Sequence, residues 1–165
     1  MGRSFQPIDE QVTVNKLENL WIYNSAYQCF DWGSITFGPT IEHVQRDYEA
    51  PGGGGLYLIP GFIDIHMHIE SSMTTPTEFS NAVLPHGTTT IVADCHEVAN
   101  VFGVEGLCDY MDLPSLVDVF YAIPSSVPST SMELETNFGP IDAEQVKALC
   151  KRKDVIALGE IMNAN

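Results

Sequence analysis

The chain has 165 residues, of which 44% are hydrophobic and 18% are charged, so its composition is that of an ordinary globular protein. Seven basic side chains face 22 acidic ones, which gives a formal net charge of −15. This charge argues against nucleic acid or an anionic membrane surface as a partner, because both need clustered Lys and Arg. No Lys or Arg occurs between Arg46 and Lys147. A ligand of that stretch is therefore expected to be neutral, cationic or held through a metal ion.

The sequence offers no targeting or membrane segment. Its first ten residues are too polar for a secretory signal, and no run approaches the roughly 18 apolar residues of a membrane helix. The four cysteines, Cys29, Cys95, Cys108 and Cys150, are scattered and form no Cys-x-x-Cys pair. We therefore expect free thiols in a cytoplasmic protein without a membrane partner.

Residues 1–55 are expected to form a small β region that ends in a glycine-rich linker. The stretch 12–48 is rich in aromatic and β-branched residues, interrupted by Asn, Gly and Pro. Pro51 is followed by four glycines, which could be mistaken for a phosphate-binding loop. Such a loop presents its amides at the start of a helix, whereas these glycines lead into the strand-like run 56–59, so a linker is favoured.

From residue 56 to residue 165 short apolar strands alternate with helical segments. The predicted strands cover residues 61–68, 88–94, 116–123 and 155–160. The run 75–78 combines the spacing of a helix cap with Pro at the first helical position, and Gly87 ends that helix. Asp142 and Gln145 repeat the cap spacing before a second helix. Strand followed by helix, repeated along the chain, predicts parallel β/α units.

Two histidines, His66 and His68, lie at the end of the first predicted strand. Strand side chains alternate between faces, so both imidazoles point to the same side. At the carboxyl end of a strand, where active sites of α/β barrels lie, such a pair predicts a metal site. Asp64 shares this face, where it either orients an imidazole or serves a structural role; both interpretations stay open.

Two further groups of polar residues follow later strands. The segment after the second strand begins like the His-Glu-x-x-His motif of zinc proteases, but Asn100 stands where the second His is required. Its His96 and Glu97 are expected at the same edge as His68, where they either line a pocket or stabilise a loop. Glu160 ends the fourth predicted strand, and burying it without a cation would be costly. A place beside a metal is therefore physically attractive, although the spacing alone leaves it open.

Several blocks of the chain, in the same order, resemble the adenine deaminase family of the amidohydrolase superfamily. The form Pro-Gly-x-x-Asp-x-His-x-His at residues 60–68 belongs to the whole superfamily, and its continuation Ile-Glu-Ser-Ser-Met is more specific to adenine deaminases. The other similar blocks cover residues 84–90, 93–100, 124–130 and 158–163. The resemblance extends from Leu56 to the C-terminus and is weak before it, where relatives would have a small β-sandwich.

The resemblance implies an α/β fold, a metal-dependent (β/α)₈ TIM-like barrel that hydrolyses adenine to hypoxanthine and ammonia in purine salvage. Carried over, His66 and His68 would bind the first metal ion and Glu160 would bridge two ions. A divalent cation at such a site makes water reactive at neutral pH, towards the amine-bearing ring carbon. Two imidazoles and a carboxylate suit Mn, Fe or Zn, and the sequence does not choose among them.

Candidate substrate contacts follow from position alone. Glu70, taken as one alternation beyond the second histidine, is expected to accept a hydrogen bond from adenine or a related aminopurine and to take part in catalysis. His96 and Glu97 are further candidates for the substrate pocket. The remaining histidines, His43 and His86, are expected to be structural.

The chain is short for such a fold. A (β/α)₈ barrel needs eight strands and typically about 250 residues, whereas the region after residue 60 supplies four predicted strands. We therefore expect the first half of a barrel, without the later histidines and the aspartate that the resemblance implies. The chain is either the N-terminal part of an adenine deaminase or a truncated non-catalytic remnant with partial metal binding. Open sheet edges favour self-association or a complementing C-terminal half, and little turnover by the chain alone.

Overall fold

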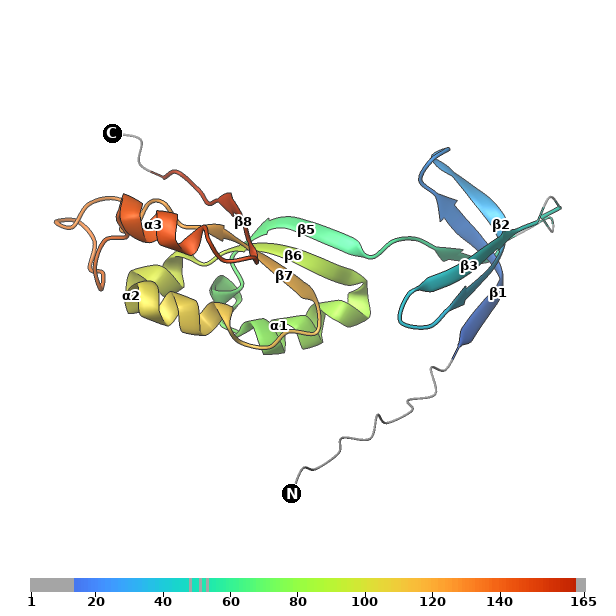
Figure 1. The fold of residues 1–165 in the computed structure, drawn as a ribbon, viewed down its shortest axis with the longest axis horizontal. Helices are drawn as coiled ribbons and strands as arrows, with labels where there is room; N and C mark the ends of the chain where they lie inside the picture. Colours follow the sequence, from blue (N-terminus) through green and yellow to red (C-terminus); the bar gives the residue numbers. More distant parts are fainter. Residues whose placement is uncertain (1–13, 48, 51, 53, 163–165) are drawn as a thin grey trace, which may run out of the picture. The chain divides into compact units, whose positions relative to one another are not determined.

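The computed structural model describes residues 14–47, 49, 50, 52 and 54–162 (Figure 1). The chain divides into two compact units, residues 1–60 and residues 61–165. Some residues discussed in the sequence analysis lie outside the described part. They are the first ten residues, two positions of the glycine-rich segment, and the last residue of the block 158–163 that resembles adenine deaminases. No helix in the described part is long and apolar enough to cross a membrane.

The first unit is a four-stranded sheet in the order β3-β2-β1-β4. Its strands are β1 (Asn15–Asn24), β2 (Cys29–Phe37), β3 (Ile41–Arg46) and β4 (Leu56–Leu58). Neighbours among β1, β2 and β3 are antiparallel, and β4 runs parallel to β1. The described residues thus form one sheet here, whereas the resemblance led us to expect a sandwich. Because β4 completes this sheet, the units divide after Pro60, five residues beyond the expected boundary.

The second unit contains a parallel sheet in the order β5-β6-β7-β8. Its strands are β5 (Phe62–Met67), β6 (Thr88–Asp94), β7 (Asp118–Ile123) and β8 (Val155–Leu158). The four strands and their parallel pairing confirm the prediction, with ends that agree within two residues. The last strand stops at Leu158, so Glu160 lies two residues beyond β8 instead of ending it.

Helices follow the strands, and the cap signals at Thr75 and Asp142 predicted two of them. They are η1 (Glu70–Ser72), α1 (Pro76–Val83), η2 (Leu84–His86), α2 (His96–Met111) and α3 (Ala143–Leu149). The Thr75 side chain caps α1 by accepting the backbone N–H of Glu78. Gly87 follows η2 with φ +95°, a conformation that costs glycine little. Both bonds of the capping box between Asp142 and Gln145 are present at the start of α3.

All three α-helices pack against one face of the parallel sheet (Figure 1). This core contains odd-numbered strand residues, among them Ile91, Tyr121 and Ile123, together with side chains of α1, α2 and α3. Because strand side chains alternate, the even-numbered residues, including His66, point to the other face. No helix among the described residues covers that second face.

Candidate metal site

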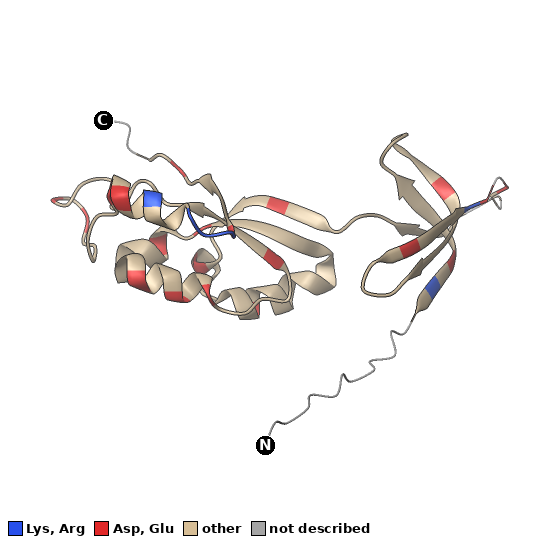
Figure 2. Cartoon of the chain, in the orientation of Figure 1, with Lys and Arg blue, Asp and Glu red and all other residues tan. Residues whose placement is uncertain are grey.

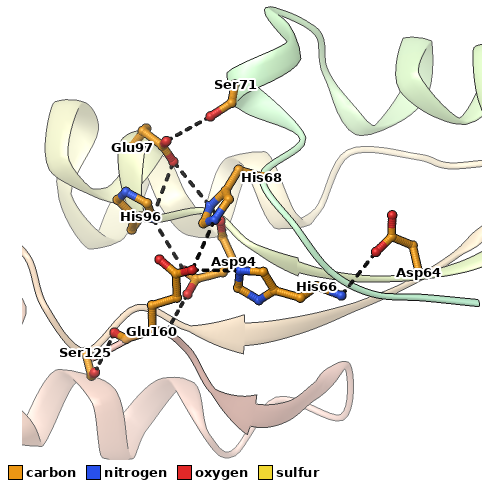
Figure 3. A network of polar contacts seen from close by, with 9 residues as sticks. All are labelled: Asp64, His66, His68, Ser71, Asp94, His96, Glu97, Ser125 and Glu160. Carbon is orange, nitrogen blue, oxygen red and sulfur yellow. Dashed lines mark hydrogen bonds and ion pairs between the residues drawn. The ribbon is translucent and has the colours of Figure 1, made fainter. Parts of the chain in front are cut away.

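Three of the predicted metal ligands come together at the carboxyl ends of β5 and β8 (Figure 3). His66 Nε2 lies 2.9 Å from Glu160 Oε1, and His68 Nε2 lies 3.8 Å from the same oxygen. One ligand atom from each residue lies within 4.8 Å of the others. Donor atoms bound to one divalent cation at about 2.0–2.2 Å lie roughly 3–4 Å apart. The arrangement therefore fits a single ion.

A hydrogen bond fixes which nitrogen of His68 is available. The Nδ1 atom lies 2.7 Å from the backbone carbonyl oxygen of Asp94. A carbonyl oxygen only accepts, so Nδ1 carries the proton and donates it. In the neutral ring the lone pair then belongs to Nε2, the atom that faces Glu160. His68 is thus held in the tautomer that a metal ligand needs.

Glu160 is fixed by contacts of its backbone. Its N–H donates to Asp94 Oδ2 at 2.7 Å, and its carbonyl oxygen accepts from the hydroxyl of Ser125 at 3.2 Å. Asp94 is fully buried. Burial raises the pKa of this carboxyl above its usual value, although the hydrogen bond from Glu160 opposes the shift. The side chain of Glu160 is therefore positioned by a loop that is bonded on both sides.

A second group contains His68, His96 and Glu97, the last two from the first turn of α2. Glu97 Oε2 lies 3.4 Å from His96 Nδ1 and 3.6 Å from His68 Nδ1. That nitrogen of His68 already donates to the Asp94 carbonyl, so this group could use it for a cation only by losing the bond. The group with His66 and Glu160 needs no such loss. It is the better metal site of the two.

Glu70 does not lie on the strand as predicted. Strand β5 ends at Met67 and Glu70 opens η1, so the alternation argument is wrong for this residue. Its carboxyl group is nevertheless mostly buried beside Glu97. Burial, and then the neighbouring carboxyl of Glu97, raise the pKa of Glu70 to about 7.

The pKa of Glu97 shifts in the opposite direction. Burial raises its pKa, but hydrogen bonds from Glu70 and from the Ser71 hydroxyl outweigh burial, and the pKa falls below its usual value. The bond from Ser71 Oγ to Glu97 Oε1 measures 2.8 Å. Glu70 is therefore the member of the pair that holds a proton near neutral pH.

The site lies in a region without basic side chains. No Lys or Arg lies between Arg46 and Lys147, and Figure 2 shows acidic residues along β5 and α2. The Asp64 side chain bonds the backbone of His66 and not its imidazole ring: Asp64 Oδ1 accepts the backbone N–H of His66 at 3.2 Å. Any neutralising cation at this cluster has to come from the histidines or from solution.

Sequence reasoning missed two features of the site. Asp94 was treated only as the end of a strand, and His96 and Glu97 were not placed on a helix, although they begin α2. The signal for Asp94 was present, since an acidic residue that ends a buried apolar strand must find a partner. Its partner Glu160 is 66 residues away, and no local pattern gives that distance.

The sequence model of the amidohydrolase family matches residues 57–164. The chain therefore belongs to the amidohydrolase family. Fold and site agree with this, because the matched region contains the parallel sheet and all three residues of the candidate metal site.

The chain is also similar to proteins named adenine deaminase. It is 48% identical to the adenine deaminase of Clostridium perfringens over an alignment of 155 residues, and this alignment covers 89% of this chain and 27% of that protein. It is 54% identical to adenine deaminase 2 of Shouchella clausii over 159 residues, again 89% and 27%. Identity to adenine deaminase 2 of Oenococcus oeni is 61% over 109 residues, 66% and 19% of the two chains. The chain thus spans about a quarter of the length of these relatives.

Proposed function

We propose that this chain is the N-terminal part of a metal-dependent adenine deaminase, which hydrolyses adenine to hypoxanthine and ammonia in cytoplasmic purine salvage. The observation that supports this most is the meeting of His66, His68 and Glu160 at the carboxyl ends of β5 and β8. Active sites of parallel β/α barrels lie at this end of the strands. The names of the similar proteins supply the reaction.

The parallel sheet is proposed to be the first half of a (β/α)₈ barrel. Two strands separate β5 from β8. In a flat sheet their axes would lie about 14 Å apart, at about 4.8 Å for each step. His66 and Glu160 nevertheless approach to 2.9 Å, which favours a sheet that curves away from its helices. A curved parallel sheet with helices outside is the geometry of a barrel segment.

The three ligands have separate tasks in this proposal. A divalent cation, Mn²⁺, Fe²⁺ or Zn²⁺, supplies a Lewis acid that lowers the pKa of water. His68 offers Nε2 because its other nitrogen is bonded to a carbonyl. His66 must release any proton from Nε2 before it can bind, and the Glu160 carboxylate 2.9 Å away can accept it. Glu160 is also proposed to bridge a second ion in the complete enzyme.

The acidic pair beside the ligands is proposed to contact adenine or a related aminopurine. Glu70 has a pKa of about 7, so its carboxyl can donate or accept a hydrogen bond, or move a proton, near neutral pH. Glu97 lies beside it, His96 Nδ1 lies 3.4 Å from Glu97 Oε2, and these two residues form the proposed wall of the substrate pocket. Glu70→Gln in an active assembly should weaken adenine binding or turnover by about tenfold or more. Unchanged values of both would contradict this role.

The exposed edges of the sheet support a need for a partner. Ile63 and Ile65 on β5 are 62% and 77% exposed, and Ile156 and Leu158 on β8 are 56% and 51% exposed. Apolar edge strands associate readily. The proposed partner is a complementing C-terminal half, with self-association as the alternative when that half is absent. The same exposure supports the second candidate function, a non-catalytic remnant that binds metal.

Turnover separates the two candidates. The purified chain should bind Mn²⁺, Fe²⁺ or Zn²⁺ and release little hypoxanthine or ammonia from adenine. Co-expression with the remaining part of the Clostridium perfringens relative should restore hypoxanthine production, and His66→Asn in the same assembly should abolish it. Robust turnover by the chain alone would contradict the need for a partner. A folded, metal-loaded assembly without turnover would favour the remnant.

A further inference from the structure

We propose that Asp94, at the end of the inner strand β6, is the positioning residue of the metal site. It orients His68, which follows the edge strand β5, and Glu160, which follows the edge strand β8. This inference rests on the proposed metal site of His66, His68 and Glu160. Asp94 was not among the expected site residues, and it offers no atom to that ion. Its role is to orient two residues that do.

Asp94 makes one contact to each of the two ligands. Its backbone carbonyl accepts Nδ1–H of His68 at 2.7 Å, and its Oδ2 accepts the backbone N–H of Glu160 at 2.7 Å (Figure 3). The first contact fixes the tautomer and ring orientation of a histidine that follows β5. The second fixes the backbone of a carboxylate that follows β8. Partners of this kind raise metal affinity because the ligands need no rearrangement on binding.

The Asp94 carboxylate packs directly against Gly159. A Cβ atom added at Gly159 would lie 2.2 Å from Asp94 Oδ2 and 2.8 Å from its Cγ. Any side chain at position 159 would therefore displace the carboxylate from the N–H of Glu160. The absence of a side chain directly before the ligand is what permits the contact.

Burial makes the Asp94 contacts strong. The residue is 0% exposed, and its other oxygen, Oδ1, has no hydrogen-bond partner and lies 4.0 Å from His96 Nδ1. A hydrogen bond to a carboxylate in such surroundings is worth more than one in water. The Glu160 backbone is thus bonded to a buried carboxylate, and the His68 ring to the main-chain carbonyl of the same residue.

The test measures Co²⁺ binding to the full chain, by titration and by the visible absorption of bound Co²⁺, whose bands depend on coordination geometry. Asp94→Ala should weaken binding about 10- to 100-fold and change the absorption bands. Asp94→Asn retains an oxygen that can accept the N–H of Glu160, so it should recover most of the affinity. Gly159→Ala should act like Asp94→Ala.

Ser80→Ala is the matched control. Ser80 is also fully buried and its oxygen also accepts a backbone N–H, from Leu116 at 3.0 Å, but it lies on α1 and contacts no proposed ligand. This variant should lower thermal stability and leave Co²⁺ affinity and absorption unchanged.

The outcomes separate the inference from the function on which it rests. If Co²⁺ binding requires His66 but Asp94→Ala binds within about threefold of the wild type, the positioning role is wrong and the metal site stands. Equal weakness of Asp94→Asn and Asp94→Ala would also overturn the role. If the wild-type chain shows no Co²⁺ binding that depends on His66, the proposed metal site fails and takes the inference with it.

Discussion

Two clusters of charged side chains in the second unit differ in whether they contain a basic side chain of their own. Before β8, Arg152 donates to Asp112 at 2.7 Å and to Asp154 at 2.8 Å. Hydrogen bonds to these carboxylates raise the pKa of the Arg152 guanidinium, and hydrogen bonding to Arg152 lowers the pKa of Asp154 against the effect of burial. This cluster contains its own cation.

The cluster at the carboxyl ends of the strands contains no Lys or Arg. Its buried side-chain atoms without a hydrogen-bond partner in the described structure include Asp94 Oδ1 and His96 Nδ1. Buried polar atoms without partners are rare and demand an explanation, such as an ion or ligand. The comparison separates a cluster that is neutralised by its own cation from one whose buried polar atoms lack partners in the described structure.

The largest expected effect breaks the binding cluster directly. His66→Asn removes one of three proposed ligands, so cation affinity should fall by about 100-fold or more, a larger loss than that expected for a residue outside the ligand set. Calorimetric titration with Mn²⁺ measures this. His86→Asn is the control, because His86 lies in η2 and belongs to neither cluster of ligands. Equal losses in both variants would show that the effect is unspecific.

The next largest effect is a pH dependence of stability that arises from the acidic pair Glu70 and Glu97. The pKa of Glu70 is raised from 4.5 to about 7 on folding, so between these values the folded chain keeps a proton that the unfolded chain has released. The free energy of unfolding should therefore fall as pH rises from 4.5 to 7. Glu70→Gln has no carboxyl to ionise, so it lacks this pH-dependent loss of stability. At pH 8 its free energy of unfolding should exceed that of the wild type by about 1–2 kcal/mol, after allowance for partial exposure.

Urea unfolding of both proteins between pH 5 and pH 8 provides the measurement. The stability difference between Glu70→Gln and the wild type should grow with pH across this range. A constant difference would mean that Glu70 titrates normally in the folded chain.

The smallest effect concerns the self-neutralised cluster. Arg152→Met should lower the free energy of unfolding by about 1 kcal/mol at low salt, because the guanidinium is partly exposed, and by less at 1 M salt. Cation affinity should not change. Lys147→Met is the matched control, since its pair with Glu144 spans 3.8 Å between exposed side chains and should contribute little. A loss of cation affinity in Arg152→Met would abolish the distinction between the two clusters.

Much of the fold follows from local signals in the sequence. The strands β5 to β8 and the caps at Thr75 and Asp142 depend on apolar runs and on spacings of three residues, and both were predicted. Helix α2 was not predicted. Its chain is kinked at Gly103, with φ +68° and ψ −166°, and its first turn carries polar residues that suggested chemistry instead of a helix. Closure into a barrel remains a prediction.

In the candidate site, too, local patterns placed some residues correctly and missed others. Alternation along a strand was enough to place His66 and His68 on one side, and their role in metal binding remains a prediction. Glu70 was misplaced because the chain leaves the strand after Met67 and turns into η1, which ends the alternation. Glu160 and Asp94 depend on contacts across the sheet, and such contacts between distant segments leave no periodic trace in the sequence.

The proposed ligands lie on or just after β5 and β8, the two outermost strands of the parallel sheet, and this has a mechanical consequence. An ion shared by His66 and Glu160 acts as a cross-link between side chains 94 residues apart. Because the ligands meet only in the folded chain, binding of the ion stabilises the folded state that brings these distant segments together. Chelation should therefore loosen the four-residue strand β8 first, and amide hydrogen exchange at residues 155–158 should report it.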